Sequence, residues 1–130
     1  MIRAALGVIA GLIVWGVVAT ALDILLRFAL PGYAAAEPQL NFTLGMMIAR
    51  LALPGAVPSL IAGFASTWIA RGDRRVFAAL AIILVAVFLP VHYRLWLKFP
   101  IWYHLTFLGS LVLLTFLGAR LASRFSRMAT

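Results

Sequence analysis

The residues with the clearest chemical potential are charged side chains inside long apolar runs. Asp23 and Arg27 lie near the end of the first run, and Arg50 lies inside the second. A charged side chain near the centre of a bilayer costs on the order of 3 kcal/mol on insertion scales, so such residues usually face a bundle interior and pair. We therefore expect a buried ionic cluster in which Asp23 and Arg50 form a structural pair.

The depth of the two residues favours this pair. Asp23 lies about eight residues before Pro31, and Arg50 lies about nine residues after Asn41, which places both roughly 12 to 14 Å from their helix ends at 1.5 Å per residue. Arg27, one turn beyond Asp23, can share the same carboxylate.

This cluster leaves one positive charge without a partner. The sequence offers four candidates: Glu37, the backbone carbonyl of Arg50 freed by Pro54, a lipid phosphate, and a small anion. Three interpretations follow. The cluster is a structural network that fixes helix register, a site for an anion or an anionic headgroup, or a proton relay through Asp23.

Two histidines form a second candidate site. His92 and His104 are predicted near the outer ends of the third and fourth helices, at a comparable depth. A shared metal or haem is conceivable there, but two histidines lack the further ligands of a zinc site, and the chain has no cysteine. We expect interfacial histidines bonded to backbone or headgroups, and no metal or cofactor.

The elements that position these residues are membrane-spanning helices. Hydrophobic residues make up 65% of the 130 residues, the mean hydropathy is +1.11, and only 11% are charged, against about 25% in soluble proteins. Spanning a bilayer takes roughly 20 apolar residues in a helix. We predict an all-α integral membrane protein, one domain over residues 1–130, with a four-helix bundle at about 4–30, 40–70, 76–96 and 101–121.

The distribution of basic residues predicts the topology. Arg94 and Lys98 lie in the third connection, and the first connection carries only Glu37. Seven basic residues lie at the two chain ends and in the second connection: Arg3, Arg71, Arg74, Arg75, Arg120, Arg124 and Arg127. The positive-inside rule then puts both termini in the cytoplasm, in a bacterial inner membrane. Because the basic residues are dispersed at helix ends, we expect no nucleic-acid partner.

Prolines and small residues predict the shape and packing of the helices. Proline lacks an N–H, so we expect kinks at Pro54 and Pro58 in the second helix and at Pro90 in the third. Small residues let helix backbones approach closely. We expect four of them to pack helices together: Gly7 and Gly11, spaced as GxxxG, and Ser59 and Gly63 in the second helix.

The sequence contains no legible catalytic set, so we expect a non-enzymatic membrane protein. It would act as a subunit of a membrane complex or as a module that binds anionic lipid or anions. Its outer-leaflet pocket would use Arg50, Arg27, Asp23, His92 and His104. The expected partners are membrane lipids and a second copy or a larger membrane complex. The alternative is a small oligomeric transporter or channel with Asp23 and Arg50 on its path, since broken helices with ion sites near the midplane are a usual transporter device.

Overall fold

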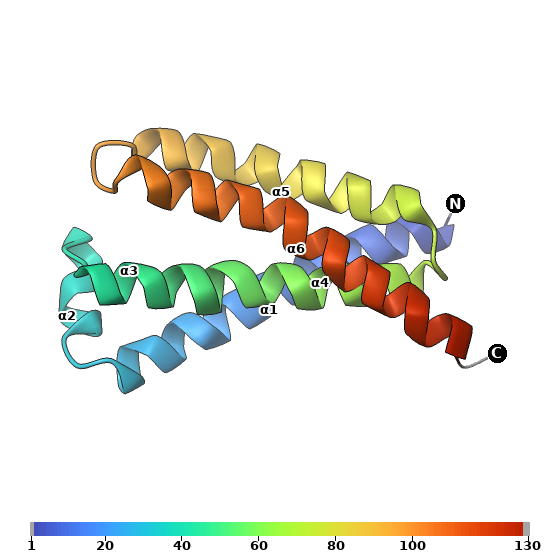
Figure 1. The fold of residues 1–130 in the computed structure, drawn as a ribbon, viewed down its shortest axis with the longest axis horizontal. Helices are drawn as coiled ribbons and strands as arrows, with labels where there is room; N and C mark the ends of the chain where they lie inside the picture. Colours follow the sequence, from blue (N-terminus) through green and yellow to red (C-terminus); the bar gives the residue numbers. More distant parts are fainter. Residues whose placement is uncertain (1, 129–130) are drawn as a thin grey trace.

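Four long helices make up the bundle (Figure 1). The computed structural model describes residues 2–128, with side chains through residue 125; the side chain of Arg127, used above for topology, lies outside them. The elements are α1 (Ile2–Ala29), α2 (Tyr33–Ala36), η1 (Glu37–Gln39), α3 (Leu44–Arg50), η2 (Leu51–Ala56), α4 (Val57–Ile69), α5 (Arg74–Arg94) and α6 (Ile101–Met128). Four spans, with α3, η2 and α4 as one, are long and apolar enough to cross a membrane. The prediction of an all-helical chain with four such spans is confirmed.

Both ends of the chain lie at the same end of the bundle, beside the turn between α4 and α5 (Figure 1). We call this the terminal end. The opposite end holds α2, η1 and the 95–100 turn between α5 and α6, and we call it the loop end. Which end faces the cytoplasm stays a prediction.

Local backbone geometry explains where the second span begins. Gly32, with φ 83°, and Leu40, with φ 57°, both take the left-handed conformation and reverse the chain. Thr43 then caps the helix, because its hydroxyl accepts a hydrogen bond from the backbone N–H of Met46 at 3.3 Å. The span therefore starts at Leu44, four residues later than the predicted start at residue 40.

The two ends of α5 also follow from its caps. Asp73 accepts a hydrogen bond from the backbone N–H of Arg75 at 3.0 Å, so α5 begins at Arg74 instead of residue 76. The side-chain hydrogen bond from Arg75 lowers the pKa of Asp73. At the other end α5 stops at Arg94, two residues before the predicted end, because Leu95 leaves the helical conformation at φ −95° and ψ 8°. Helix α6 continues to Met128, well past the predicted end at residue 121.

The prolines lie inside continuous helical segments. Pro54 lies in η2, which is a π-helix, and Pro90 lies inside α5. The kinks predicted at these positions stay predictions.

Glycines set how closely the helices approach one another. A Cβ on Gly63 of α4 would collide with the backbone of Thr115 in α6, and a Cβ on Gly118 would collide with the backbone of Leu60. The α4–α6 crossing is therefore a reciprocal backbone contact. Three other predicted packing residues lie at contacts of α1. Gly7 faces the Ser66 carbonyl, Gly11 faces Leu80, and Ser59 Oγ accepts a 2.9 Å hydrogen bond from Trp15 Nε1.

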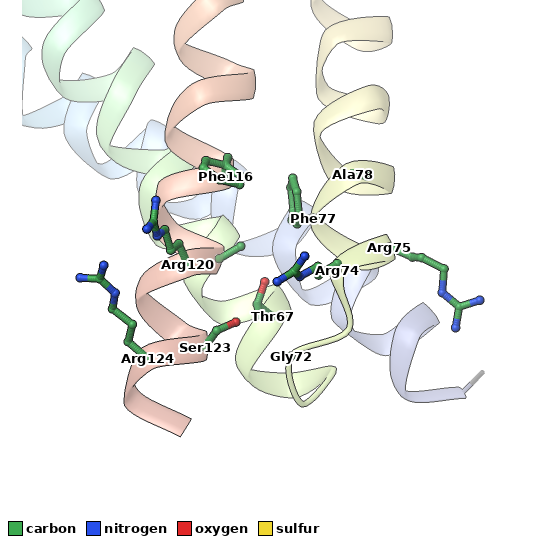
Figure 2. A pocket seen from close by; sticks show the side chains of 11 residues that line it. Thr67, Gly72, Arg74, Arg75, Phe77, Ala78, Phe116, Arg120, Ser123 and Arg124 are labelled. Carbon is green, nitrogen blue, oxygen red and sulfur yellow. The ribbon is translucent and has the colours of Figure 1, made fainter. Parts of the chain in front are cut away.

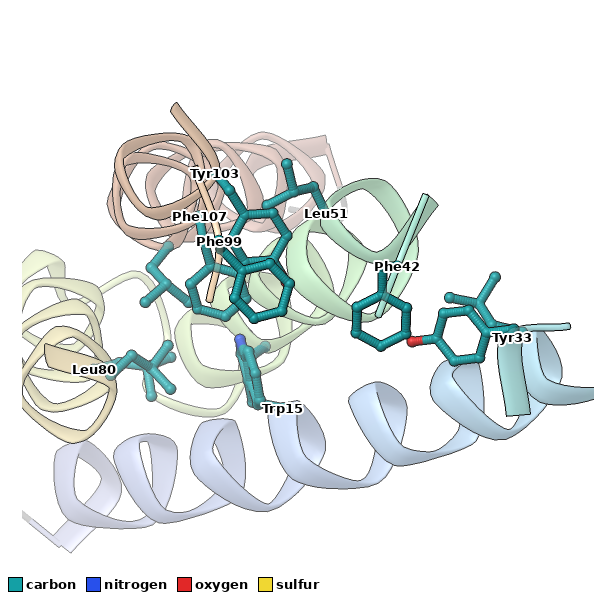
Figure 3. Close-up of a cluster of buried hydrophobic side chains, with 12 residues drawn as sticks. Trp15, Tyr33, Phe42, Leu51, Leu80, Phe99, Tyr103 and Phe107 are labelled. Carbon is teal, nitrogen blue, oxygen red and sulfur yellow. The ribbon is translucent and has the colours of Figure 1, made fainter. Parts of the chain in front are cut away.

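Buried aromatic side chains form much of the core (Figure 3). Tyr33 stacks on Phe42 with ring centroids 5.1 Å apart, and Phe99 stacks on Tyr103 at 4.3 Å. Phe42 also stacks on Phe99 at 6.0 Å, so the chain of rings joins both connecting segments of the loop end to α6. Large apolar side chains also cover the outside of the bundle, as a helix bundle in lipid requires: Phe28, for example, is 86% exposed.

Candidate functional site

Charged and phenolic side chains meet at the loop end. They come from α1, the α2–η1 connection, α3 and α6, and we call them the polar cluster: Asp23, Arg27, Tyr33, Glu37, Arg50 and Tyr103. Four of these six residues were expected in one cluster from the sequence, whereas Tyr33 and Tyr103 were missed. The signal available in the sequence was only that both tyrosines flank predicted helix ends on the same side as Asp23 and Arg50.

The ion pairs of the polar cluster balance its charge. Arg50 Nη1 lies 3.3 Å from Asp23 Oδ1 and 3.5 Å from Glu37 Oε2. Arg27 Nη2 lies 3.2 Å from Asp23 Oδ2, and Arg27 Nε lies 2.6 Å from Glu37 Oε1. Two guanidinium groups therefore face two carboxylates. The surplus charge expected from the sequence has a partner within the chain, Glu37.

The two phenols extend this network. The Tyr33 hydroxyl donates to Asp23 Oδ1 at 2.9 Å and accepts from Arg50 Nη1 at 2.7 Å. Arg50 Nε donates to the Tyr103 hydroxyl at 3.1 Å. Burial raises the pKa of Tyr33 to about 12, so this phenol stays neutral at physiological pH. Arg50 is thus held by side chains from α1, α2 and α6, and its guanidinium also lies 5.3 Å from the ring centroid of Phe42.

The backbone of η2 changes one expected partner. Hydrogen bonds in a π-helix run from each N–H to the carbonyl five residues earlier. The Arg50 carbonyl is therefore in register with the N–H of Gly55 and does not depend on Pro54. The expectation of a free carbonyl beside the arginine was wrong, because the wider π-helical turn moves the register past the proline.

The two histidines contact each other, and they adjoin the polar cluster at the ring of Tyr103, whose centroid lies 6.2 Å from that of His92 and 5.9 Å from that of His104. His92 Nδ1 on α5 lies 2.6 Å from His104 Nδ1 on α6, and the side chains are 5% and 0% exposed. Trp96 stacks on His104 at 4.8 Å, and the ring of Phe107 lies 4.7 Å from that of His92. Over residues 2–125, no three histidine, aspartate or glutamate side chains come together as metal ligands. Of the five residues expected in one pocket, Asp23, Arg27 and Arg50 therefore lie in the polar cluster, whereas His92 and His104 form a pair that adjoins this cluster at Tyr103.

A cavity of about 680 Å³ lies at the terminal end, between the ends of α4, α5 and α6 (Figure 2). Four arginines line it together with polar and apolar side chains: Thr67, Gly72, Arg74, Arg75, Phe77, Ala78, Phe116, Ala119, Arg120, Ser123 and Arg124. Sequence reasoning missed this site. The arginines were visible in the sequence, but the positive-inside rule explained all of them as topology signals, so no binding site was predicted from them.

The arginines of this cavity differ in direction. In Figure 2 the guanidinium of Arg74 points between α5 and α6, toward Thr67, whereas Arg75 points away from the cavity. Arg75 also pairs with Asp73, with Nη2 3.3 Å from Oδ2. The Thr67 hydroxyl is buried and has no hydrogen-bond partner among the described residues. The cavity thus combines an inward-pointing cation with an unsatisfied hydroxyl.

Comparison with known proteins adds no assignment, since no protein-family model, curated protein or solved structure matches the chain. The functional conclusion depends on the geometry of the two ends.

Proposed function

We propose that this chain is a non-enzymatic membrane protein that binds the phosphate group of an anionic phospholipid in the cavity at the terminal end. The observation that carries the proposal is the inward-pointing guanidinium of Arg74 beside the buried, unpartnered hydroxyl of Thr67. This keeps the lipid-binding function expected from the sequence but moves the site from the polar cluster to the opposite end.

Unbalanced charge supports an anionic ligand. Within the described part of the chain, Arg74, Arg120 and Arg124 form no ion pair, and the nearby carboxylate of Asp73 already holds Arg75. Arginine binds phosphate through charge-assisted hydrogen bonds and stays protonated under all ordinary conditions. A phosphate is therefore the chemical group that this cavity is best suited to hold.

The Thr67 hydroxyl supports a ligand with acceptor oxygens. A buried hydroxyl without a partner costs about 1 to 3 kcal/mol. A phosphate oxygen in the cavity would accept the hydrogen bond that Thr67 does not make within the protein. Ser123 lines the same cavity and offers a second hydroxyl.

The apolar part of the lining favours a lipid over free phosphate. Phe77 and Phe116 lie edge to face with ring centroids 5.5 Å apart, and Phe116 is 40% exposed on the outside of the bundle. These rings offer an apolar surface for acyl chains next to the arginines. If the predicted topology holds, this end meets the cytoplasmic leaflet, whose anionic lipids attract basic segments.

Native mass spectrometry in nanodiscs tests the proposal. We expect the wild-type protein to retain phosphatidylglycerol and not phosphatidylcholine, and Arg74→Gln to reduce that retention by about tenfold, as expected for the loss of a charge-assisted hydrogen bond of about 1.4 kcal/mol. Arg75→Gln is the matched control, since it removes the same charge from a side chain that points away. Equal retention by Arg74→Gln and wild type would overturn the proposal. Inorganic phosphate that displaced the lipid at millimolar concentration would indicate a site for the free anion instead.

The polar cluster supports a second candidate, a small transporter or channel. The specific observation is the π-helix that follows Arg50, because π-helical turns are frequent at functional sites. Ion flux into proteoliposomes that Asp23→Asn abolished would favour this candidate. Vesicles that stayed tight to every tested ion would count against it.

A further inference from the structure

The contact between His92 and His104 is unusual for two groups that can both become cations. Their Nδ1 atoms lie 2.6 Å apart, the rings stand at 88° to each other, and both side chains are buried. This contact joins the last turn of α5 to the first turn of α6. It therefore holds the two helices together where the 95–100 turn connects them.

Proton counting shows when this contact is stable. A hydrogen bond between two Nδ1 atoms needs one N–H and one lone pair, so at most one of these two nitrogens carries a hydrogen. His104 Nε2 is buried without a partner among the described residues. The neutral pair is therefore best satisfied with the hydrogen of His104 on Nδ1, because a buried N–H at Nε2 would have no acceptor.

A proton on each imidazole would break the contact for two reasons. Two N–H groups would face each other at a distance suited to one shared hydrogen, and two positive charges would repel. The Nε2 of His104 would also gain a hydrogen with no acceptor. The groups around the pair offer no compensating anion: Tyr103 faces it from α6 and is bound to Arg50 at the end of α3.

The other charged groups near the pair are already engaged or exposed. Asp23 and Glu37 face Arg50 and Arg27. Arg94 at the end of α5 and Lys98 in the turn are exposed cations. A charged imidazole therefore has no free carboxylate to pair with among the described residues around it, because the two carboxylates of the loop end, Asp23 and Glu37, bind arginines.

We propose that the His92–His104 pair is a proton-operated latch that holds the 95–100 turn closed on α6 and releases it when both imidazoles are protonated. Trp96 stacks on His104 with the ring planes at 13°, and Phe99 stacks on Tyr103 at 12°. Because Trp96 follows α5 in the chain, separation of His92 from His104 would move Trp96 away from the His104 ring on which it stacks. Release therefore frees the turn first and loosens the Tyr103 contact with Arg50 second.

Distance measurement between spin labels tests the latch. The chain has no native cysteine, so Leu97→Cys in the turn, which is 97% exposed, and Ile48→Cys on α3, which is 53% exposed, give a specifically labelled pair. We expect a reversible shift to a longer mean distance between about pH 8 and about pH 3.5, because two buried imidazoles in contact are both protonated only in strongly acidic solution. His104→Asn is the matched variant, because its neutral amide lies near the position of Nδ1 and cannot take up a proton.

The outcomes separate the latch from other titrating groups. The double-cysteine protein with His104→Asn should keep the short distance at both pH values. An unchanged distance in the protein with both histidines would overturn the latch. A shift that persisted in His104→Asn would also overturn it, because protonation of Asp23 or Glu37 would then cause the opening. His92→Asn provides the same comparison on α5 if His104→Asn does not fold.

Discussion

The two ends of the bundle treat positive charge in opposite ways. At the loop end, Arg27 and Arg50 meet Asp23 and Glu37 within 3.5 Å, so the network is closed. At the terminal end, arginines line a cavity while Asp73 binds Arg75, which points away. The comparison teaches that an arginine inside a span does not by itself indicate a ligand. The informative arginines are those whose counter-ion the described part of the chain does not provide.

The largest expected effect comes from the helix crossing between the two ends. Gly63→Ala would drive its Cβ into the backbone of Thr115, and overpacking of this kind costs about 3 kcal/mol. Because α6 and the span that contains α4 both run from the loop end to the terminal end, we expect a lower free energy of unfolding and a loss of lipid retention together. Titration with SDS measures the first, and native mass spectrometry measures the second.

Gly109→Ala is the control for this experiment. It makes the same change on α6 at a position with no neighbouring atom within 4 Å. Its stability should equal or exceed that of the wild type, since alanine favours helix over glycine. A comparable loss in both variants would show that the crossing is not the cause.

The next largest effect comes from replacing one aspartate by asparagine at each end and comparing the loss of stability. Asp23→Asn leaves Arg27 and Arg50 with one carboxylate between them, and we expect the free energy of unfolding to fall by about 2 kcal/mol, less than for a fully buried pair because Asp23 is 21% exposed. Asp73→Asn, at an exposed pair, should leave it nearly unchanged. Equal losses of stability in the two variants would contradict the distinction between a loop end held by ion pairs and a terminal end whose cavity arginines lack them.

A reciprocal pair of variants tests the assignment of structure to one end and binding to the other. Arg50→Gln should lower the free energy of unfolding by about 1.5 kcal/mol, through loss of its charged hydrogen bonds, and leave phosphatidylglycerol retention unchanged. Arg74→Gln should leave the free energy of unfolding unchanged and reduce phosphatidylglycerol retention. Loss of retention in Arg50→Gln with full retention in Arg74→Gln would return the lipid site to the loop end.

The smallest effect concerns pH and the Tyr33 phenol. Burial raises the pKa of Tyr33 to about 12, whereas an unfolded tyrosine ionises near about 10. The stability that the neutral phenol contributes is therefore complete below about pH 10 and is lost as the pH rises toward about 12. Unfolding curves across this range should show the decline, and Tyr33→Phe should show less of it.

Much of the fold follows from the sequence because hydropathy determines which segments cross a bilayer. Seven of the eight ends of the four spans were predicted within four residues, and the exception is the end of α6, which lies seven residues beyond the predicted residue 121. Thr43 and Asp73 set two starts through single hydrogen bonds, which compete with hydropathy over only a few residues. The depth argument brought Asp23 and Arg50 to the same level, and the structure places their side chains 3.3 Å apart.

The rest of the polar cluster could not be predicted because it depends on chain reversal and helix rotation. Glu37 reaches Arg27 only after the left-handed residues Gly32 and Leu40 turn the connection back. Tyr103 joins through α6, whose rotation the sequence does not specify. The cavity is a space between three helices, and the residue pattern of any single helix does not reveal it.

The contact of Gly63 with Thr115 has a mechanical consequence. Because the backbones of α4 and α6 are in close contact here, a tilt of α6 against α4 would turn about this point. His104 lies about 16 Å to one side of Thr115 and Arg120 about 8 Å to the other, at 1.5 Å per residue. If α6 tilted as a rigid rod about this point, His104 and Arg120 would move in opposite directions, and Arg120 would move about half as far.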